Sequence, residues 1–442
     1  MQQTVTWIGT AWARALERYP RRVAQRVPAV REVPGRLAIR GRIAASVEQH
    51  ALLAAGAVWA AWLAAVLGVV IGGVEAGAIS DPHHSWLHYG GPLWPLFTWD
   101  FGWYHSVAVL GYPHGQGGPF YAFFPLWPLV LRASGSIPDW AAALAVVVAA
   151  SGLAFLGVAA ASPSGQGRRA ALALACWPGS FMLLLAYPDV LALAAAAWAA
   201  ALVLRGRPFL AGALGAVAAV ARPTGFLIAI PLLLVARGPR ARGVAAGAPL
   251  AAAVAVQIYF WRRSGDALAF IHAQELPIWH RNGPSRFSKW PGHVAHAFSV
   301  HATLLIGAAL VGVVLVALVA RRLGRWYAGA LAYGLVAAAL LFGAQTTQTR
   351  IESAVLAVAV PILGVLWWLG PRYRPWALFA TAVVAVSFLS GTVTSFARQA
   401  LFAFPLYWAV ADGPRQLRHP LVAAVAVAAN VAFALTLAKY AP

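Results

Sequence analysis

The stretch ALLAAGAVWAAWLAAVLGVVIGG, residues 51–73, decides the fold class of this chain. It carries no charged residue, and a helix of about 20 apolar residues crosses the hydrocarbon core of a bilayer. Similar or slightly shorter apolar runs recur along the chain, without strand-like alternation. Because the backbone must satisfy its own hydrogen bonds in lipid, the sequence predicts an all-α integral membrane protein.

The composition points the same way. Of the 442 residues 61% are hydrophobic and 10% are charged, whereas soluble domains carry about 25% charged residues. The formal net charge of +21 would indicate a nucleic-acid partner in a soluble protein. Here the positive-inside rule explains the charge, so we expect no nucleic acid. The single cysteine, Cys176, excludes a disulfide framework.

Basic clusters between the apolar runs predict how the chain crosses the membrane. They lie at residues 168–169, 205–207, 237–242, 321–325, 372–374 and 415–418. Placing them all in the cytoplasm predicts spans near 51–73, 139–161, 170–186, 190–204, 208–221, 224–236, 244–260, 301–320, 326–343, 350–369, 374–394, 398–411 and 421–440. We therefore expect a polytopic bundle of about 11–13 transmembrane helices in a bacterial plasma membrane.

The same topology defines two domains and two long external segments. Residues 1–48 form a basic segment, predicted to be a cytoplasmic amphipathic collar on anionic lipid. Residues 49–442 form the polytopic membrane domain, with extracytoplasmic segments at about 74–138 and 261–300. The first of these segments has no Lys or Arg before Arg132. We expect the active face of the protein on this side.

Asp100 is the candidate catalytic residue. It lies in TWDFGWYHSVAVLGYPHGQGGPFYAFFPLWP, residues 98–128, which is too rich in Gly and Pro for one spanning helix. A base beside an acceptor hydroxyl needs a semi-enclosed site, and Trp99, Phe101, Trp103 and Tyr104 would restrict water there. The alternative is an interfacial loop in which Asp100 is a helix N-cap.

Asp189 and Arg222 are candidates from two external turns, AYPD at 186–189 and RPTG at 222–225. Asp189 is either the N-cap of the next span or a second carboxylate for substrate or metal. An arginine at a membrane edge is costly and faces a partner. Arg222 is predicted either to pair with Asp189 or to hold a phosphate.

Ten of the twelve histidines lie in the external segments or at their edge: His83, His84, His88, His105, His114, His272, His280, His293, His296 and His301. With Asp81 or Glu275 they could bind a divalent metal. None of the spacings is typical of a metal motif, so we expect interfacial hydrogen bonding and leave a divalent metal as the alternative.

The second external segment also departs from the positive-inside pattern, with Arg262, Arg263, Arg281, Arg286 and Lys289 beside Glu275, Trp279 and Trp290. External cations beside aromatic rings suit a lipid phosphate or pyrophosphate, or anionic headgroups in general. Arg350 with Glu352, and Arg398, are further candidates for a phosphate contact or a structural ion pair.

An ordered set of these motifs resembles the PIG-V family, GT-C-type mannosyltransferases named for the second mannosyltransferase of GPI-anchor assembly. The resemblance spans residues 51 to about 411. It rests on Trp99-Asp100, Trp103-Tyr104, Gly111-Tyr112, Phe123-Phe124-Pro125-Leu126 with Pro128, Tyr187-Pro188-Asp189, Arg222-Pro223-Thr224-Gly225, Gln274 with Trp279 and Arg281, and Arg398 with Phe404-Pro405. Two positions depart from the family pattern, since Thr98 stands where Arg is frequent and Asp189 where Glu is usual.

The resemblance implies a GT-C-type membrane glycosyltransferase. It would transfer a hexose, by preference mannose, from a polyprenyl-phosphate-linked donor to a hydroxyl of a lipid or glycan acceptor, with inversion. Asp100 would be the general base. The substrate would meet Trp99, Trp103, Tyr104, Tyr112, Asp189, Arg222, Gln274, Trp279, Arg281 and Arg398. The alternatives are a transporter or flippase for lipid-linked sugars and a non-catalytic subunit that binds prenyl lipids. The one-sided polarity and the lack of an internal repeat disfavour the transporter.

Overall fold

A computed structural model of the chain describes residues 34–79, 91–115, 117–135, 138–279, 347–389, 396–418 and 420–435. These residues form α-helices and short 3-10 helices and no strand. The predicted spans at 301–320 and 326–343 lie outside the described residues, so the number of passes stays a prediction.

The chain divides into two compact units, residues 1–49 and 50–442. Of the first unit the structure describes residues 34–49, which belong to helix α2 (Pro34–Glu75). The amphipathic collar predicted for residues 1–48 falls largely outside the described residues.

Within the described residues, three helices are long and apolar enough to cross a membrane. They are residues 49–75 of α2, α5 (Asp139–Ala160) and α10 (Pro239–Ser264). Shorter apolar helices accompany them, among them α7 (Asp189–Leu204) and α8 (Pro208–Ala221). These findings support the prediction of an all-α membrane protein.

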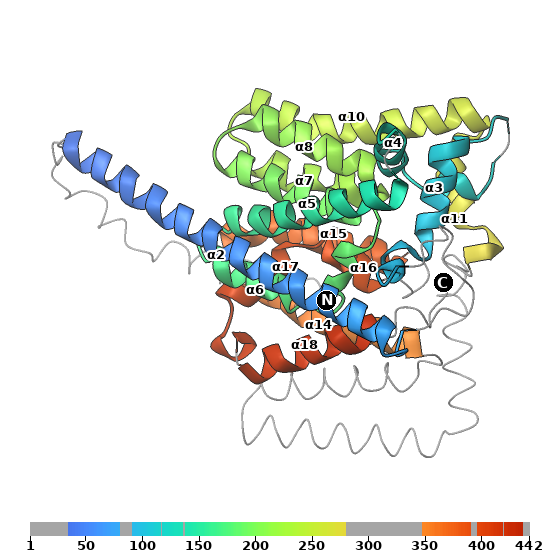
Figure 1. Cartoon of the computed structure of the whole chain (residues 1–442). Helices are drawn as coiled ribbons and strands as arrows, with labels where there is room; N and C mark the ends of the chain where they lie inside the picture. The colour runs from blue at the N-terminus through green and yellow to red at the C-terminus, as the bar shows by residue number, and fades with distance from the viewer. Residues whose placement is uncertain are drawn as a thin grey trace, which may run out of the picture. The chain divides into compact units, whose positions relative to one another are not determined.

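Helices α5, α7, α8 and α10 lie side by side, each packed on the next (Figure 1). Small residues permit the close approach, as is common between membrane helices. A Cβ on Gly212 of α8 would lie 2.7 Å from the carbonyl oxygen of Val244 in α10. A Cβ on Gly157 of α5 would lie 3.0 Å from the Cβ of Ala197 in α7. Larger side chains at these glycines would therefore separate the helices.

A second group of helices follows later in the chain, drawn in orange and red in Figure 1. It contains α14 (Thr347–Trp368), α15 (Arg374–Leu389), α16 (Phe396–Leu401), α17 (Pro405–Asp412) and α18 (Pro420–Leu435). Buried rings of Trp376, Phe404 and Trp408 join α15 to α17. Helix α15 also contacts α9 (Ala229–Val235), which connects this group to the first.

Three predicted spans are interrupted in the structure. The apolar run at 170–186 is helix α6 (Gly167–Ala175), a turn, and the 3-10 helix η3 (Ser180–Leu184). The span at 398–411 is divided between α16 and α17, and that at 224–236 is the 3-10 helix η4 (Pro223–Ile228) followed by α9. For the first two the reason is local, because Pro178-Gly179 and Pro405 interrupt helical hydrogen bonding within apolar sequence. In the third, Pro223 is the first residue of η4, and α9 follows η4 directly.

In its described residues, the segment predicted as external at 74–138 forms short helices after the end of α2. They are η1 (Trp94–Phe97), α3 (Asp100–Leu110), η2 (Pro119–Ala122) and α4 (Leu126–Ala133). The second segment starts later than predicted, because α10 continues to Ser264. It then forms α11 (Ala269–Gln274) and η5 (Pro277–Trp279) before the described residues end at 279.

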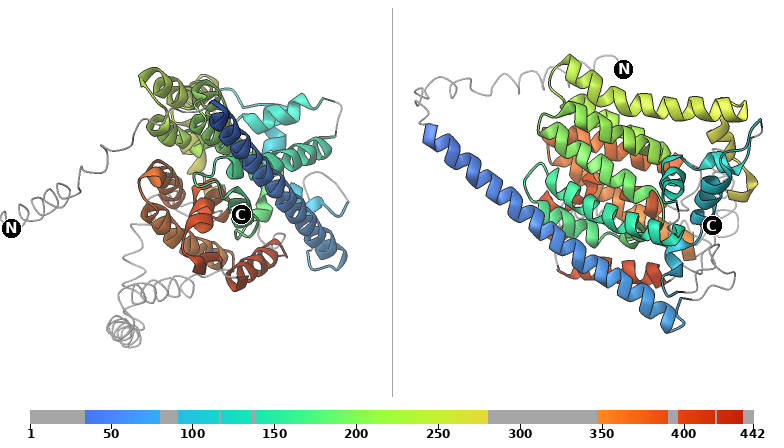
Figure 2. Two further views of the ribbon diagram at one scale, coloured as in Figure 1. Left: turned by 90° about the vertical axis from the view of Figure 1, so that its left-hand side faces the viewer. Right: turned by 45° about the horizontal axis from the view of Figure 1, so that its top comes forward.

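The Arg-rich turns lie at one end of the helices, and the turns that carry Asp100, Asp189, Arg222 and Arg398 lie at the other end. Arg205, after α7, donates to Ala160 at the end of α5, and Asp412 accepts from Ser164 and Tyr373. These turns belong to the Arg-rich end. The starts of α3 and α7, the turn after α8 and the start of α16 meet at the other end, where Figure 2 shows α3 and α11 beside the end of α10.

Candidate functional site: two carboxylate–arginine pairs

The turn before α3 has a strained backbone. Trp99 has φ of 56° and ψ of −117°, and it is the one non-glycine residue with positive φ in the described part of the chain. Such a conformation costs about 1–3 kcal/mol and persists only where the surroundings hold it. Tyr187 supplies that hold. Its hydroxyl donates to the carbonyl of Thr98 at 2.8 Å and accepts from the backbone N–H of Asp100 at 3.1 Å.

This turn presents Asp100 to an arginine from far along the chain. Nη1 of Arg398, in α16, donates to Oδ2 of Asp100 at 2.5 Å. The two side chains are 17% and 18% exposed, so solvent still reaches the pair. The guanidinium carbon of Arg398 lies 5.2 Å from the centre of the Tyr187 ring, a favourable cation–π position. Within the described residues Oδ1 of Asp100 accepts no hydrogen bond.

Asp189 and Arg222 make a second, more buried pair. Nη1 of Arg222 lies 2.8 Å from Oδ1 of Asp189. Both residues are less than a tenth exposed. The guanidinium carbon of Arg222 lies 5.1 Å from the centre of the Phe402 ring. The ion pair with Asp189, one of the two alternatives predicted for Arg222, is present, and the phosphate contact stays a prediction.

Neither aspartate caps its helix. Trp99 and Pro188 occupy the N-cap positions of α3 and α7, and no side-chain cap hydrogen bond forms at either start. The N-cap alternatives for Asp100 and Asp189 are therefore wrong. Each aspartate is the first helical residue, where the positive end of the helix dipole stabilises its negative charge. Its carboxylate contacts the arginine of its pair.

The two pairs form one cluster. Tyr187 lies two residues before Asp189 and holds the turn that carries Asp100, while Phe402 follows the helix that carries Arg398. Tyr104 lies beside them, its ring 6.3 Å from that of Tyr187. Two carboxylates and two guanidinium groups leave the cluster formally neutral.

The electrostatics of the tyrosines reflect this arrangement. Burial raises the pKa of Tyr104 well above its ordinary value, and the charges of Asp189 and Asp100 raise it further. Burial and then Asp100 raise the pKa of Tyr187 in the same way. Both hydroxyls therefore stay protonated at neutral pH and can act as hydrogen-bond donors.

Several buried donors in the cluster have no acceptor. Among the described residues, Nε of Arg222, Nε of Arg398 and Oγ1 of Thr224 are buried without a hydrogen-bond partner. An unsatisfied buried donor costs about 1–3 kcal/mol, more when it is charged. Burial also lowers the pKa of Arg222, against the opposing effect of Asp189. An oxyanion placed beside these groups would supply the missing acceptors.

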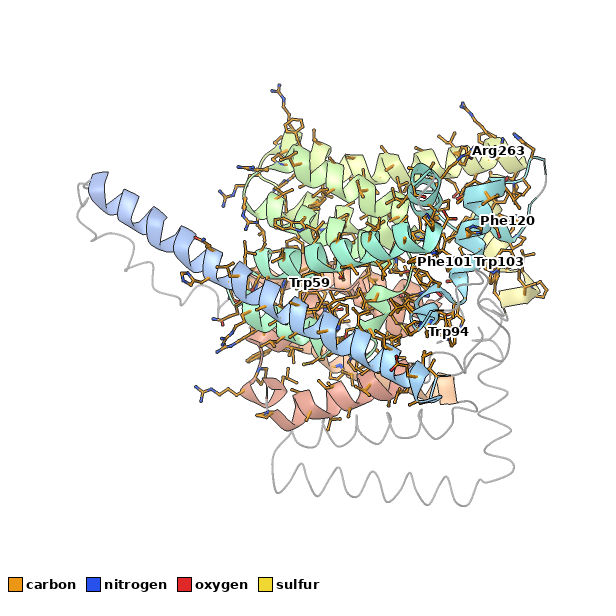
Figure 3. The ribbon with its side chains drawn as sticks, viewed as in Figure 1. Trp59, Trp94, Phe101, Trp103, Phe120 and Arg263 are labelled. Atoms are coloured by element: carbon orange, nitrogen blue, oxygen red, sulfur yellow. The ribbon has the colours of Figure 1, made fainter. Side chains whose placement is uncertain are left out.

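Aromatic rings border the cluster. Trp103 stacks on Phe123 at 5.9 Å and contacts Phe120 and Trp279 edge-on at 5.8 and 5.4 Å. Tyr104 connects this group to the cluster, with its ring 4.9 Å from that of Phe123. Figure 3 shows Phe101, Trp103, Phe120 and Arg263 at the same end of the helices. Such a wall can exclude water and hold the face of a sugar or an isoprenoid.

Tyr112 and Gln274 hold the backbone of the 111–123 loop. The Tyr112 hydroxyl donates to the carbonyl of Phe123 at 2.6 Å, and Nε2 of Gln274 donates to that of Ala122 at 3.3 Å. Arg263 donates to the carbonyl of Tyr112 at 2.7 Å. The structure thus places these two predicted residues behind the aromatic wall, where they fix its position.

The described histidines of the two external segments each meet a polar or charged side chain. His105 pairs with Asp139 at 2.8 Å, His272 with Asp266 at 2.6 Å, and His114 contacts Arg263. No group of three or more His, Cys, Asp or Glu side chains gathers within the described residues. The remaining histidines of the two segments, and Asp81, Arg281, Arg286, Lys289 and Trp290, lie outside those residues; so do the side chains of Arg350 and Glu352.

Sequence reasoning did not assign roles to Tyr187, Phe402 and Thr224. A signal existed for Tyr187 and Thr224, because each stands next to a proline in a turn that also carries a site residue. Phe402 stands in the apolar sequence LFAFP, residues 401–405, and nothing there distinguishes it from a core residue.

No known family model matches the chain, and a search of the curated proteins finds no significant match.

Proposed function

We propose that this chain is a membrane glycosyltransferase of GT-C type, related to the PIG-V family, that uses a polyprenyl-phosphate-linked hexose as donor. The observation that carries the proposal is the meeting of Asp100, Asp189, Arg222 and Arg398 at one end of the helices, beside an aromatic wall. The motifs that resemble the family converge on this cluster. The resemblance favours mannose as the sugar.

The chemistry assigns each group a task. The acceptor hydroxyl gives its proton to Oδ1 of Asp100, and its oxygen attacks the anomeric carbon of the donor sugar. The bond from that carbon to the lipid phosphate breaks, and its electron pair leaves on the phosphate oxygen. Attack from the opposite face inverts the anomeric configuration.

The arginines suit the leaving phosphate. Their Nε groups are buried and unpaired, and a phosphate that accepts from them is stabilised most when its charge increases in the transition state. Arg398 also fixes the second oxygen of Asp100, so that the base and the phosphate site are positioned by the same side chain.

The arrangement of the turns supports an external site. The Arg-rich turns near Arg205 and Arg237 lie at the end opposite the cluster. The positive-inside rule assigns such turns to the cytoplasm, so it favours a cluster at the extracytoplasmic surface of a bacterial plasma membrane. A glycolipid or glycan acceptor would be met there.

The test is sugar transfer by the purified full-length protein in lipid nanodiscs. The donor is polyprenyl-phosphate mannose, the acceptor is a total lipid or glycan extract, and the product is a new mannosidic bond detected by mass spectrometry. We expect Asp100→Asn to lower transfer by about 10²–10⁴-fold, the usual contribution of a general base. Asp139→Asn is the matched control, because Asp139 also begins a helix but pairs with His105 outside the cluster.

The outcomes separate the candidate functions. Full transfer by Asp100→Asn would overturn the assignment of the base. Movement of lipid-linked sugar across the bilayer without a glycosidic product would indicate the transporter. Binding of the donor with neither movement nor product would indicate a lipid-binding subunit.

A further inference from the structure

A cavity lies at the Arg-rich end, away from the cluster. It has a volume of about 390 Å³ and opens between the turn from α7 to α8 and the turn from α9 to α10. Arg205 and Arg237 line it from the two turns, and Pro208 and Ala241 line it from the first turns of α8 and α10. None of these residues takes part in the proposed reaction.

The cavity is positively charged by three independent features. Two arginines line it, and Arg207, Arg240 and Arg242 stand in the same turns. Two helices begin at it, and the first N–H groups of a helix lack intrahelical acceptors and carry the positive end of the helix dipole. The sequence has no acid between residues 190 and 265, so neither of the two turns carries an acid of its own.

Two of these arginines, Arg205 and Arg242, are held by backbone carbonyls. Arg205 donates from Nη1 to the carbonyl of Ala201 at 3.1 Å and from Nη2 to that of Ala160 at 3.4 Å. Nε of Arg242 donates to the carbonyl of Ala236 at 3.1 Å. Asp412, an acid at the same end, is engaged by Ser164 and Tyr373 and is not available to these arginines.

The surroundings of the cavity are apolar and exposed. Leu233 and Leu234 of α9 are each 48% exposed, and Phe209 and Leu210 of α8 are 73% and 51% exposed. Arginines next to exposed leucine and phenylalanine side chains are typical of a protein surface at the depth of the lipid headgroups. There the cations meet the headgroups and the apolar side chains meet the adjoining hydrocarbon. A free phosphate in water would need the cations but not this apolar surface.

We propose that the cavity binds the headgroup of an anionic phospholipid, with its phosphate between Arg205 and Arg237 and its acyl chains along Leu233, Leu234 and Phe209. Guanidinium groups bind phosphate oxygens through charge-assisted, bidentate hydrogen bonds. Basic pockets between membrane helices recognise anionic lipids in this way. The bound lipid bridges the turns of two helical hairpins, α7–α8 and α9–α10.

The experiment is native mass spectrometry of the purified full-length protein, titrated with phosphatidylglycerol, phosphatidylcholine or inorganic phosphate. The variants are Arg237→Gln alone and Arg205→Gln with Arg237→Gln. The control is Arg168→Gln with Arg169→Gln, which removes the same charge from exposed positions of α6 outside the cavity.

We expect one phosphatidylglycerol to be retained by the wild type and the control, and the double variant to bind it about tenfold more weakly, the loss that corresponds to one charge-assisted contact. Arg237→Gln keeps the hydrogen bonds of Arg205 to the ends of α5 and α7, so we expect this variant to fold. Weaker phosphatidylglycerol binding by Arg237→Gln would therefore support the site even if the double variant does not fold. Equal weakening in the control, equal retention of phosphatidylcholine, or unchanged binding by Arg237→Gln would each overturn the proposal. Binding of inorganic phosphate as tight as that of the lipid would overturn the lipid assignment.

Discussion

Arg398 donates to Asp100 across 298 positions of sequence and joins the second group of helices to the turn that begins α3. Each residue sits on a short helix, α3 for Asp100 and α16 for Arg398. Asp100 follows a strained tryptophan, and α16 is a helix of six residues. The ion pair therefore connects the two helices that carry the site, in addition to supplying a carboxylate and a guanidinium group to it.

The first prediction separates these structural and chemical tasks. We expect Asp100→Asn to lower the free energy of unfolding by about 1–3 kcal/mol, because it leaves a mostly buried guanidinium unpaired while solvent still screens part of its charge. Adding Arg398→Gln should recover part of that loss, since neither partner is then charged. Thermal unfolding in detergent, followed by tryptophan fluorescence, measures both. Strictly additive losses in the double variant would show that the pair does not interact.

The second prediction concerns the more buried pair. Asp189→Asn should destabilise the protein by about 3–5 kcal/mol, the usual cost of removing one partner from a buried ion pair. Asp189→Glu, which introduces the residue usual in the PIG-V family that the motifs resemble, keeps the charge and should cost less. The control is Asp266→Asn, because Asp266 pairs with His272 at the surface and no measurable change is expected there. A melting temperature unchanged by Asp189→Asn would contradict the buried pairing.

The sequence could name the four charged residues of the cluster and offer the Asp189–Arg222 pair as one alternative, but it could not indicate the Asp100–Arg398 pair. Rare acids in a hydrophobic chain, and arginines in otherwise uncharged turns, are visible without a structure. Which arginine meets which aspartate depends on how α16 packs against η3 and α7, and no spacing along the chain encodes that. The catalytic and binding roles of the four residues remain predictions.

The fold shows the same division. The predicted spans at 139–161, 190–204 and 208–221 correspond closely to α5, α7 and α8, because an acid or a proline marks each start. The run at 170–186 misled the prediction, since hydrophobicity is high throughout and a turn at Trp177-Pro178-Gly179 does not lower it. An apolar run indicates that a segment is buried in lipid or in protein. It does not show whether that segment is one helix or contains a buried turn.

The third prediction is a pH dependence. The pKa of Tyr104 and that of Tyr187 are raised by burial in the folded protein, while an exposed tyrosine in the unfolded chain titrates near pH 10. Above that pH the folded state binds more protons than the unfolded state, so its stability is full below about pH 10 and falls as the pH rises further. Tyr104→Phe should make the decline of melting temperature between about pH 10 and 11 shallower. An identical slope in wild type and variant would show that Tyr104 titrates normally.

The last prediction tests the turn that carries Arg222. A Cβ on Gly225 would lie 1.8 Å from the carbonyl oxygen of Ala218, and backbone atoms cannot yield as a flexible side chain would. Gly225→Ala must therefore displace η4 from the end of α8 and move Arg222 away from Asp189, with the loss of several kcal/mol typical of severe overpacking. Gly243→Ala is the matched control, since a Cβ on Gly243 in α10 would meet nothing within 4 Å and alanine favours the helix. The measurements are the melting temperature and the rate of sugar transfer, and we expect both to fall in Gly225→Ala and to stay unchanged in Gly243→Ala. A Gly225→Ala protein as stable and as active as Gly243→Ala would mean that the close approach of η4 to α8 is not needed to hold the Arg222–Asp189 pair.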